Sequence, residues 1–236
     1  MTTYALSVTV AGQPFDMMQY NAAESLTGIF FKSAYDAFNF ENNVLTKITD
    51  ADYPGWSVVT PTSITRSGST ATATLPSAVN WESGATATVA GAAETEYNGD
   101  FVIAVTDSTH FTYTVTGTPA TPATGTITIT CGRTTVPGIV YLDSFFFVMD
   151  TNAVIYNSAL NDPTSWDALD IITAEKEPGA GVALAKSQSY VIALKEWSTE
   201  FFYNNGNSPG SPLEPVLSAF TLVGCASGES VAALDE

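Results

Sequence analysis

Apolar and polar residues alternate in short runs along most of this chain, and Gly, Pro, Asn or Asp residues separate the runs. The first such runs are Thr3–Thr9, Ile29–Lys32, Ala37–Phe40 and Val44–Lys47. A period of two over four to eight residues predicts strands with one buried face. Between the last two runs, Asn42 and Asn43 tolerate the left-handed backbone of a tight turn, so this segment predicts a hairpin.

One layout occurs twice: an apolar strand, an Asn-centred turn, a second strand, and an exit with Asp, Pro and Trp. The copies are FNFENNVLTKITDADYPGW, ending at Trp56, and FFFVMDTNAVIYNSALNDPTSW, ending at Trp166. In the first copy Pro54 should end the sheet, because proline has no N–H for the ladder. Repeated units of ~40 to 50 residues made of antiparallel strands bury their apolar faces by stacking, as in a propeller.

A third hairpin is predicted from Ser189–Leu194 and Ser198–Tyr203, turned at Glu196 and Trp197, and Tyr190 follows Phe145 by 45 positions, a blade-sized step. Between the hairpins, Thr173–Glu177 could form a short helical turn that Pro178 and Gly179 would stop. Ser230–Glu236 resembles the start of another strand.

Residues 61–133 have a different sequence pattern: brief alternating segments separated by Gly, Asp and Pro. This pattern predicts a compact β module of about five strands. Because the blade-like pattern resumes after it, the module is predicted to be inserted into the repeat. The predicted fold is all-β: partial β-propeller-like blades in residues 1–60 and 134–236, with a small β-sandwich-like module in residues 61–133. About three hairpins lie outside the module, fewer than a closed propeller needs, so we expect a partner chain or further sequence at the open edge.

The amino-acid composition argues against several classes of function. There are 24 Asp and Glu against seven Lys and Arg, a net charge of −17, and no basic cluster that could neutralise nucleic-acid phosphates. Cys131 and Cys225 lie in unrelated contexts, which predicts buried thiols rather than a disulfide or a metal site. Neither a signal peptide, nor a membrane span, nor an Asn-x-Ser/Thr sequon is expected, which favours synthesis in a cytoplasm.

Candidate chemistry is sparse. His110 is the single histidine, so triads and zinc sites lack their usual components. Carboxylates that could supply a glycosidase pair are Asp162, Asp167, Asp170, Glu175 and Glu177, although solvated or turn-capping roles are favoured. Asp150–Asn152 and Asp50–Asp52 could bind a cation, but their spacing is not that of an EF-hand loop. We therefore predict no catalytic residue, no cofactor-binding residue and no metal ligand.

The aromatic residues of the hairpins are expected to form core between blades rather than a carbohydrate platform. They are Trp166, Trp197, Phe145–Phe147 and Phe201–Tyr203. The polar segment Asn204–Pro212 is expected to be a long exposed connection, either a flexible linker between blades or a contact loop.

Several segments together resemble the packaged-DNA stabilisation proteins of short-tailed bacteriophages, also described as tail hub or nozzle subunits. They are Leu45–Pro54, Asn157–Asp170, Ala174–Glu175 with Pro178, Trp197–Asn204 with Gly206, Val223–Ala226, and Ser230–Val231. Within the module, Gly91–Gly99 and Thr118–Thr126 resemble small β modules of phage tail proteins. Members of the family are considerably longer on both sides of the matching region.

The resemblance implies a structural virion protein of the phage tail, made in the host bacterial cytoplasm and without enzyme activity. It implies a homo-oligomeric ring below the portal and the head–tail adaptor, in contact with other tail proteins, which retains packaged DNA and forms part of its ejection channel. Acidic walls would let DNA pass as non-sticking cargo. Two other readings stay open: a tail-associated adhesin that binds the host surface through the module, and a polysaccharide-degrading enzyme that uses Asp167 or Asp170.

Overall fold

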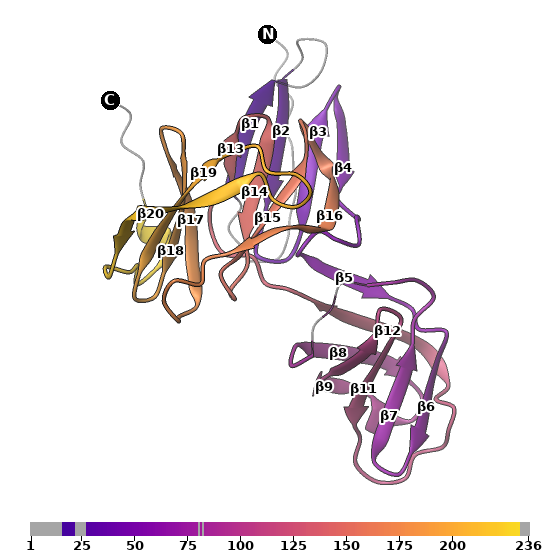
Figure 1. The fold of residues 1–236 in the computed structure, drawn as a ribbon. Helices are drawn as coiled ribbons and strands as arrows, with labels where there is room; N and C mark the ends of the chain where they lie inside the picture. The colour runs from indigo at the N-terminus through magenta and orange to yellow at the C-terminus, as the bar shows by residue number, and fades with distance from the viewer. Residues whose placement is uncertain (1–15, 22–26, 80, 82, 232–236) are drawn as a thin grey trace.

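The computed structural model describes residues 16–21, 27–79, 81 and 83–231, and within these ranges the regular structure is twenty strands and two short 3-10 helices. The strands form five antiparallel four-stranded sheets (Figure 1). The predicted all-β class is confirmed. Three sheets have the strand order of propeller blades, and the other two form the module between the first and second blade.

Each blade is a meander in which consecutive strands are hydrogen-bonded neighbours. Blade 1 consists of β1 Asp16–Asn21, β2 Thr27–Lys32, β3 Ala37–Glu41 and β4 Val44–Lys47. Blade 2 consists of β13 Val140–Leu142, β14 Phe145–Met149, β15 Val154–Ala159 and β16 Asp162–Thr173. Blade 3 consists of β17 Gly181–Ser187, β18 Tyr190–Lys195, β19 Thr199–Asn204 and β20 Leu213–Thr221.

The module is a sandwich of two sheets around its own apolar core. One sheet has the order β10 Ala104–Asp107, β11 His110–Thr114, β7 Thr70–Thr74 and β6 Ser63–Ser67. The other has the order β5 Trp56–Val59, β12 Gly125–Gly132, β8 Thr86–Ala92 and β9 Gly99–Val102. The 3-10 helix η2 Thr95–Tyr97 lies beside β8, and the other, η3 Gly228–Ser230, follows blade 3.

Local turn chemistry explains the predicted hairpins. Asn42 and Asn43 have φ values of 51° and 62°, so both central residues of the β3–β4 turn are left-handed, as a two-residue hairpin requires. Asp143 and Ser144 repeat this between β13 and β14, with φ values of 50° and 70°. Short polar side chains tolerate this backbone, and the registers of the flanking strands follow from it.

The blades stack through alternating side chains of their second and third strands. In β14, Phe146 and Val148 join a cluster with residues of blade 1, including Phe30. Phe147 and Met149, the residues between and after them, join a second cluster with residues of blade 3. Because successive side chains of a strand point to opposite faces, blade 2 is apolar on both faces and lies between its two neighbours.

The module connects to the blades through two neighbouring strands. β5 pairs with β12, and Trp56 lies opposite Gly132, so the chain leaves and re-enters the blades at almost the same point. In Figure 1 the module lies to one side of the three blades. The pairing of β5 favours a module of residues 56–132, slightly shifted from the 61–133 division that the sequence suggested. Its described residues form eight strands rather than about five.

The two copies of the repeated layout are not equivalent in structure. The first copy forms the third and fourth strands of blade 1, whereas the second copy begins with the second and third strands of blade 2. The expected equivalence is therefore wrong by one strand, because adjacent hairpins of a meander share the same turn chemistry. The step of 45 positions holds, since β14 and β18 are both second strands.

Two local predictions are wrong. The exit predicted after the second copy of the layout, with Pro163, is instead the start of β16, an edge strand that can accommodate a residue without an N–H. Thr173–Glu177 is not a helical turn, because Thr173 ends β16 and residues 174–177 belong to no helix. The Glu200 carboxylate accepts the Lys176 N–H, and Lys195 donates to the Ala174 carbonyl, so side chains of blade 3 satisfy this backbone.

Other predictions concern the ends of the described chain. The strand expected at Thr3–Thr9 lies outside the described residues, as do the last five residues of Ser230–Glu236. Ser230 ends η3 and Val231 is not in a strand. No helix in the described part of the chain is both long enough and apolar enough to cross a membrane.

The position of the module makes it removable. We expect a chain in which Asn-Gly joins Trp56 directly to Gly132 to fold, because these paired residues are already placed as the ends of a two-residue hairpin. Its thermal midpoint should stay within about 4 °C of that of the full chain's blades, which corresponds to ~1 kcal/mol. Circular dichroism and calorimetry measure this, and residues 56–132 expressed alone are the complementary control. Loss of cooperative unfolding in the excised chain would show that the blades need the module.

Candidate assembly surface

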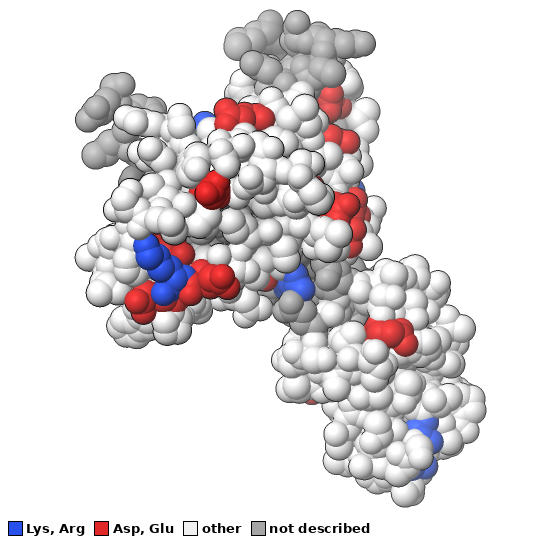
Figure 2. Space-filling model, in the orientation of Figure 1, with Lys and Arg blue, Asp and Glu red and all other residues white. Residues whose placement is uncertain are grey.

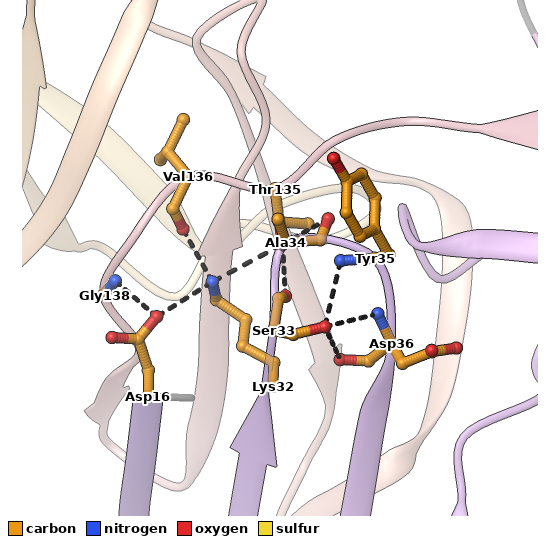
Figure 3. Close-up of polar contacts among 9 residues, drawn as sticks. All are labelled: Asp16, Lys32, Ser33, Ala34, Tyr35, Asp36, Thr135, Val136 and Gly138. Atoms are coloured by element: carbon orange, nitrogen blue, oxygen red, sulfur yellow. Dashed lines mark hydrogen bonds and ion pairs between the residues drawn. The ribbon is translucent and has the colours of Figure 1, made fainter. Parts of the chain in front are cut away.

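The buried ammonium of Lys32 binds the segment that runs from the module to blade 2, here called the return segment, to blade 1. Lys32, at the end of β2, is 1% exposed, and its Nζ donates to the Val136 carbonyl at 2.6 Å, to Asp16 Oδ2 at 3.1 Å and to Thr135 Oγ1 at 3.4 Å (Figure 3). Asp16 Oδ2 also accepts the Gly138 N–H at 2.9 Å. Burial lowers the pKa of the Lys32 ammonium, and the Asp16 carboxylate partly opposes this effect.

The turn after Lys32 holds the same segment through its backbone. Ser33 Oγ accepts the N–H groups of Tyr35 and Asp36 and so closes the β2–β3 turn. Thr135 donates its N–H to the Ala34 carbonyl at 2.9 Å and its hydroxyl to the Ser33 carbonyl at 3.0 Å. Figure 3 shows these contacts side by side with those of Lys32. The return segment is therefore bound to blade 1 at successive residues before it enters β13.

A second buried ammonium lies between blades 2 and 3. Lys195, at the end of β18, donates to the carbonyls of Ala174 and Glu177 in the connector after β16, and its Nζ lies 3.4 Å from Glu200 Oε1. Both members of this ion pair are buried. A buried pair contributes little net stability if both partners can be replaced by apolar residues, but loss of one partner leaves a charge unpaired. The pair therefore specifies how the connector docks onto blade 3.

The fourth strands of blades 2 and 3 share an irregularity. Between Tyr156 and Ser158 of β15 a single residue faces four residues of β16, 167–170. Between Glu200 and Phe202 of β19 a single residue faces four residues of β20, 216–219. By this register Trp166 and Pro215 are equivalent, and so are Ala168 and Leu217. Such bulges expose backbone groups that a neighbouring segment must satisfy.

The segment that follows the last strand of the preceding blade caps each bulge. Asp50 Oδ2 accepts the Trp166 N–H at 3.1 Å, and the Asp52 carboxylate accepts the Ala168 N–H. Burial, followed by repulsion from Asp50, raises the pKa of Asp52. At the next junction Lys176 Nζ donates to the Leu217 carbonyl at 2.9 Å. Carboxylates therefore accept N–H groups of the bulge in blade 2, whereas an ammonium donates to a carbonyl of the bulge in blade 3. Each capping group has the hydrogen-bonding role that its own bulge requires.

The second face of blade 3 is open in the described residues. Val191 and Ala193 of β18 pack against blade 2, so by alternation Ile192 and Leu194 point the other way. Both are only half-buried. On the segment after β20, Leu222 and Val223 are 70% and 68% exposed, and Trp197 beside it is 70% exposed. The Gly224 Cα lies against the backbone of Glu196 and Trp197, which brings these apolar groups to one end of the blade.

The acidic residues singled out from the sequence are not brought into one cleft. Asp162 Oδ1 accepts the N–H and hydroxyl of Thr164, and Asp167 Oδ1 accepts the Leu169 N–H at 2.9 Å. Burial and repulsion from Asp167 raise the pKa of Asp170, which accepts from Asn157. The remaining two, Glu175 and Glu177, lie on the connector after β16. The three aspartates therefore serve turns and the irregularity of β16.

The two candidate cation loops are also occupied by protein donors. Asp150 accepts the N–H groups of Asn152 and Val154 through Oδ1 and the Tyr156 hydroxyl through Oδ2, all within 2.9 to 3.0 Å. Asp50 Oδ1 accepts the Asp52 N–H at 2.9 Å. Among the residues that the structure describes, no three His, Cys, Asp or Glu side chains lie together as a metal site would require.

His110 lies on the module, where its Nδ1 is 2.9 Å from Asp107 Oδ1 and 3.0 Å from Thr109 Oγ1. The His110 hydrogen bond and two from Thr109 lower the pKa of Asp107 to about 2. This is a local turn contact on the surface. Cys131 is buried in the module core, where burial raises its pKa to about 11, and Cys225 is partly exposed.

The aromatic predictions hold in part. Trp166, Phe146, Phe147 and Phe202 are buried between blades, whereas Phe145, Phe201 and Tyr203 are half-buried and Trp197 is exposed. Asn204–Pro212 connects β19 to β20 inside blade 3, so it is not a linker between blades. The Asn205 N–H donates to the Pro212 carbonyl, and the loop is closed at its base.

Sequence reasoning missed Lys32, Lys195 and the two bulges. A lysine that ends an apolar run, as in TGIFFK and YVIALK, is the signal that could have identified the first two. Two of the partners of Lys32, Thr135 and Val136, lie about a hundred positions away, beyond the module, so its role depends on tertiary structure.

Replacement of Lys32 by Met should destabilise the chain by about 3 kcal/mol, because Asp16 and the Val136 carbonyl lose a buried partner. The matched control is Lys47→Met, since Lys47 pairs with Asp36 at the surface and should contribute less than about 1 kcal/mol. Urea unfolding of both variants measures the difference. Equal losses in the two variants would contradict the role assigned to Lys32.

Comparisons with known proteins agree with this architecture. A family model described as bacteriophage P22 Gp10, beta-propeller, matches residues 72–236. A search of curated proteins gave no match. Among solved structures, phage phi92 endosialidase is similar at 15% identity with a TM-score of 0.27, over 78% of this chain and 36% of that one, a level that carries no argument. Since the family model covers more than half of the sequence, the chain belongs to the bacteriophage P22 Gp10 family of β-propeller phage stabilisation proteins, which are structural proteins of the phage tail.

Proposed function

We propose that this chain is a hub or nozzle subunit of the phage tail, which assembles into a ring below the portal and head–tail adaptor. In that position it would retain packaged DNA and form part of the ejection channel. The role is mechanical and uses no catalytic group, cofactor or metal. Family membership supports a tail component, and the geometry of blade 3 supports assembly.

The observation that carries the proposal is the difference between equivalent blade faces. Met149 on the corresponding face of blade 2 is fully buried by blade 3, whereas Leu194, the equivalent residue of β18, is only half-buried. Val223 at the edge of this face is 68% exposed. Apolar side chains on this face are exposed to water, which is unfavourable, and their burial would be favourable. We therefore infer that a sheet of another subunit covers the face.

The charge of the chain fits a channel for DNA. The first strands β1, β13 and β17 contact one another in order, as the innermost strands of a propeller do. In the view of Figure 2, acidic side chains are spread over the surface of the blades and outnumber basic ones. With a net charge of −17, a wall built from these subunits would repel phosphates and leave the duplex free to move.

Assembly should fail when a charge is placed on the open face. Val223→Asp should weaken self-association or incorporation into tails by about tenfold or more, because an unpaired carboxylate would be buried at the contact. Val102→Asp is the matched control, since Val102 is 67% exposed on the module. Sedimentation of the purified proteins and electron microscopy of tails measure the effect. Normal assembly of Val223→Asp would contradict the proposal.

A tail-associated adhesin is the second candidate, because the module has its own core and lies apart from the blades. Full chain and chain with Asn-Gly in place of residues 57–131 can be compared for binding to host cells and to a glycan array. The hub proposal predicts no binding by either protein. Binding by the full chain that disappears with the module would favour the adhesin.

A further inference from the structure

The two blade junctions differ in how their space is filled. At the first, Trp166 of β16 is buried, with its ring centroid 5.0 Å from that of Tyr53 in an edge-to-face contact and 6.4 Å from that of Phe30. At the second, the equivalent residue is Pro215 of β20, and the register around both bulges supports this equivalence. The smaller ring leaves space that the indole fills at the first junction.

That space is an open groove of about 490 Å³ between blades 2 and 3. Its walls are Ile172, Thr173, Glu175 and Lys176 on one side and Glu200, Phe201, Pro215, Val216, Leu217, Ala219 and Phe220 on the other. Most of these side chains are apolar. Two of the three charged side chains are already paired, Glu200 with Lys195 and the Lys176 N–H, and Lys176 with the Leu217 carbonyl, so a polar ligand would find few free donors or acceptors here.

We propose that this groove receives a tryptophan or tyrosine side chain from a neighbouring tail protein, which packs where Trp166 packs at the first junction. The first junction shows which kind of side chain fits, because an aromatic ring, that of Trp166, lies at the equivalent bulge of blade 2. The Lys176 ammonium, 4.6 Å from the centroid of the Phe220 ring, already makes a cation–π contact at the rim and can make another. Leu217 beside it is 78% exposed and would be covered by the incoming segment.

The proposal concerns the groove and not the open face of blade 3, so it can fail while the proposed ring stands. Aromatic anchors in fitted pockets dominate many protein interfaces, which makes a single ring a sufficient determinant.

The test uses the full chain and N-acetyl-tryptophanamide as the probe, followed by amide chemical shifts in NMR spectra. We expect saturable shifts centred on Ile172, Leu217 and Phe220, and no such shifts with N-acetyl-alaninamide. Pro215→Trp should fill the groove from within and weaken probe binding by about tenfold or more. Ser218→Trp is the matched control, because Ser218 lies on the same bulge but does not line the groove, and it should bind the probe like the unmodified chain.

Three results would overturn the proposal. They are equal shifts with the tryptophan and alanine probes, unchanged probe affinity in Pro215→Trp, and groove shifts with saccharides but not with the tryptophan probe. The same variants, tested for incorporation into tails, report on the partner: Pro215→Trp should reduce incorporation and Ser218→Trp should not. A Pro215→Trp chain with an unchanged or higher thermal midpoint shows that any loss is not misfolding.

Discussion

Each blade of this chain has two apolar faces, and a four-stranded sheet can bury both only by lying between two others. Blade 2 meets this requirement, with Phe146 and Val148 packed on blade 1 and Phe147 and Met149 packed on blade 3. The rest of the structure depends on this constraint. It explains why the blades stack, why the module must leave the stack through one narrow connection, and why the outer face of blade 3 is the natural place for assembly.

Polar groups decide how the stacked sheets are joined. Lys32 and Lys195 bring buried charges to the two junctions, and each donates to carbonyls of a connecting segment rather than only to a carboxylate. Apolar packing alone would allow the sheets to slide, whereas these contacts have direction and fix the position of each connector. Fixed joints of this kind would suit the proposed role in a ring of the phage tail, which links the buried lysines to that role.

The sequence was informative where structure is local. Asn42 and Asn43 identified a hairpin because two left-handed residues leave few alternatives, and the alternation in β14 and β18 identified strands. The sequence did not show which strands of a blade a hairpin forms, since every turn of a meander looks alike. It also did not show the buried contacts of Lys32 with Thr135 and Val136, which follow the inserted module, or the bulges of β16 and β20, which depend on strand register.

Amide hydrogen exchange of the intact chain tests the stacking of the blades most directly, because it reports which segments open together. If both faces of blade 2 are buried as described, amides of β2, β14 and β18 exchange in one cooperative opening, and those of the module exchange in a separate one. Slow exchange of β14 and β18 together with independent, fast opening of β2 would contradict the account, because blade 1 would then not be part of the stack.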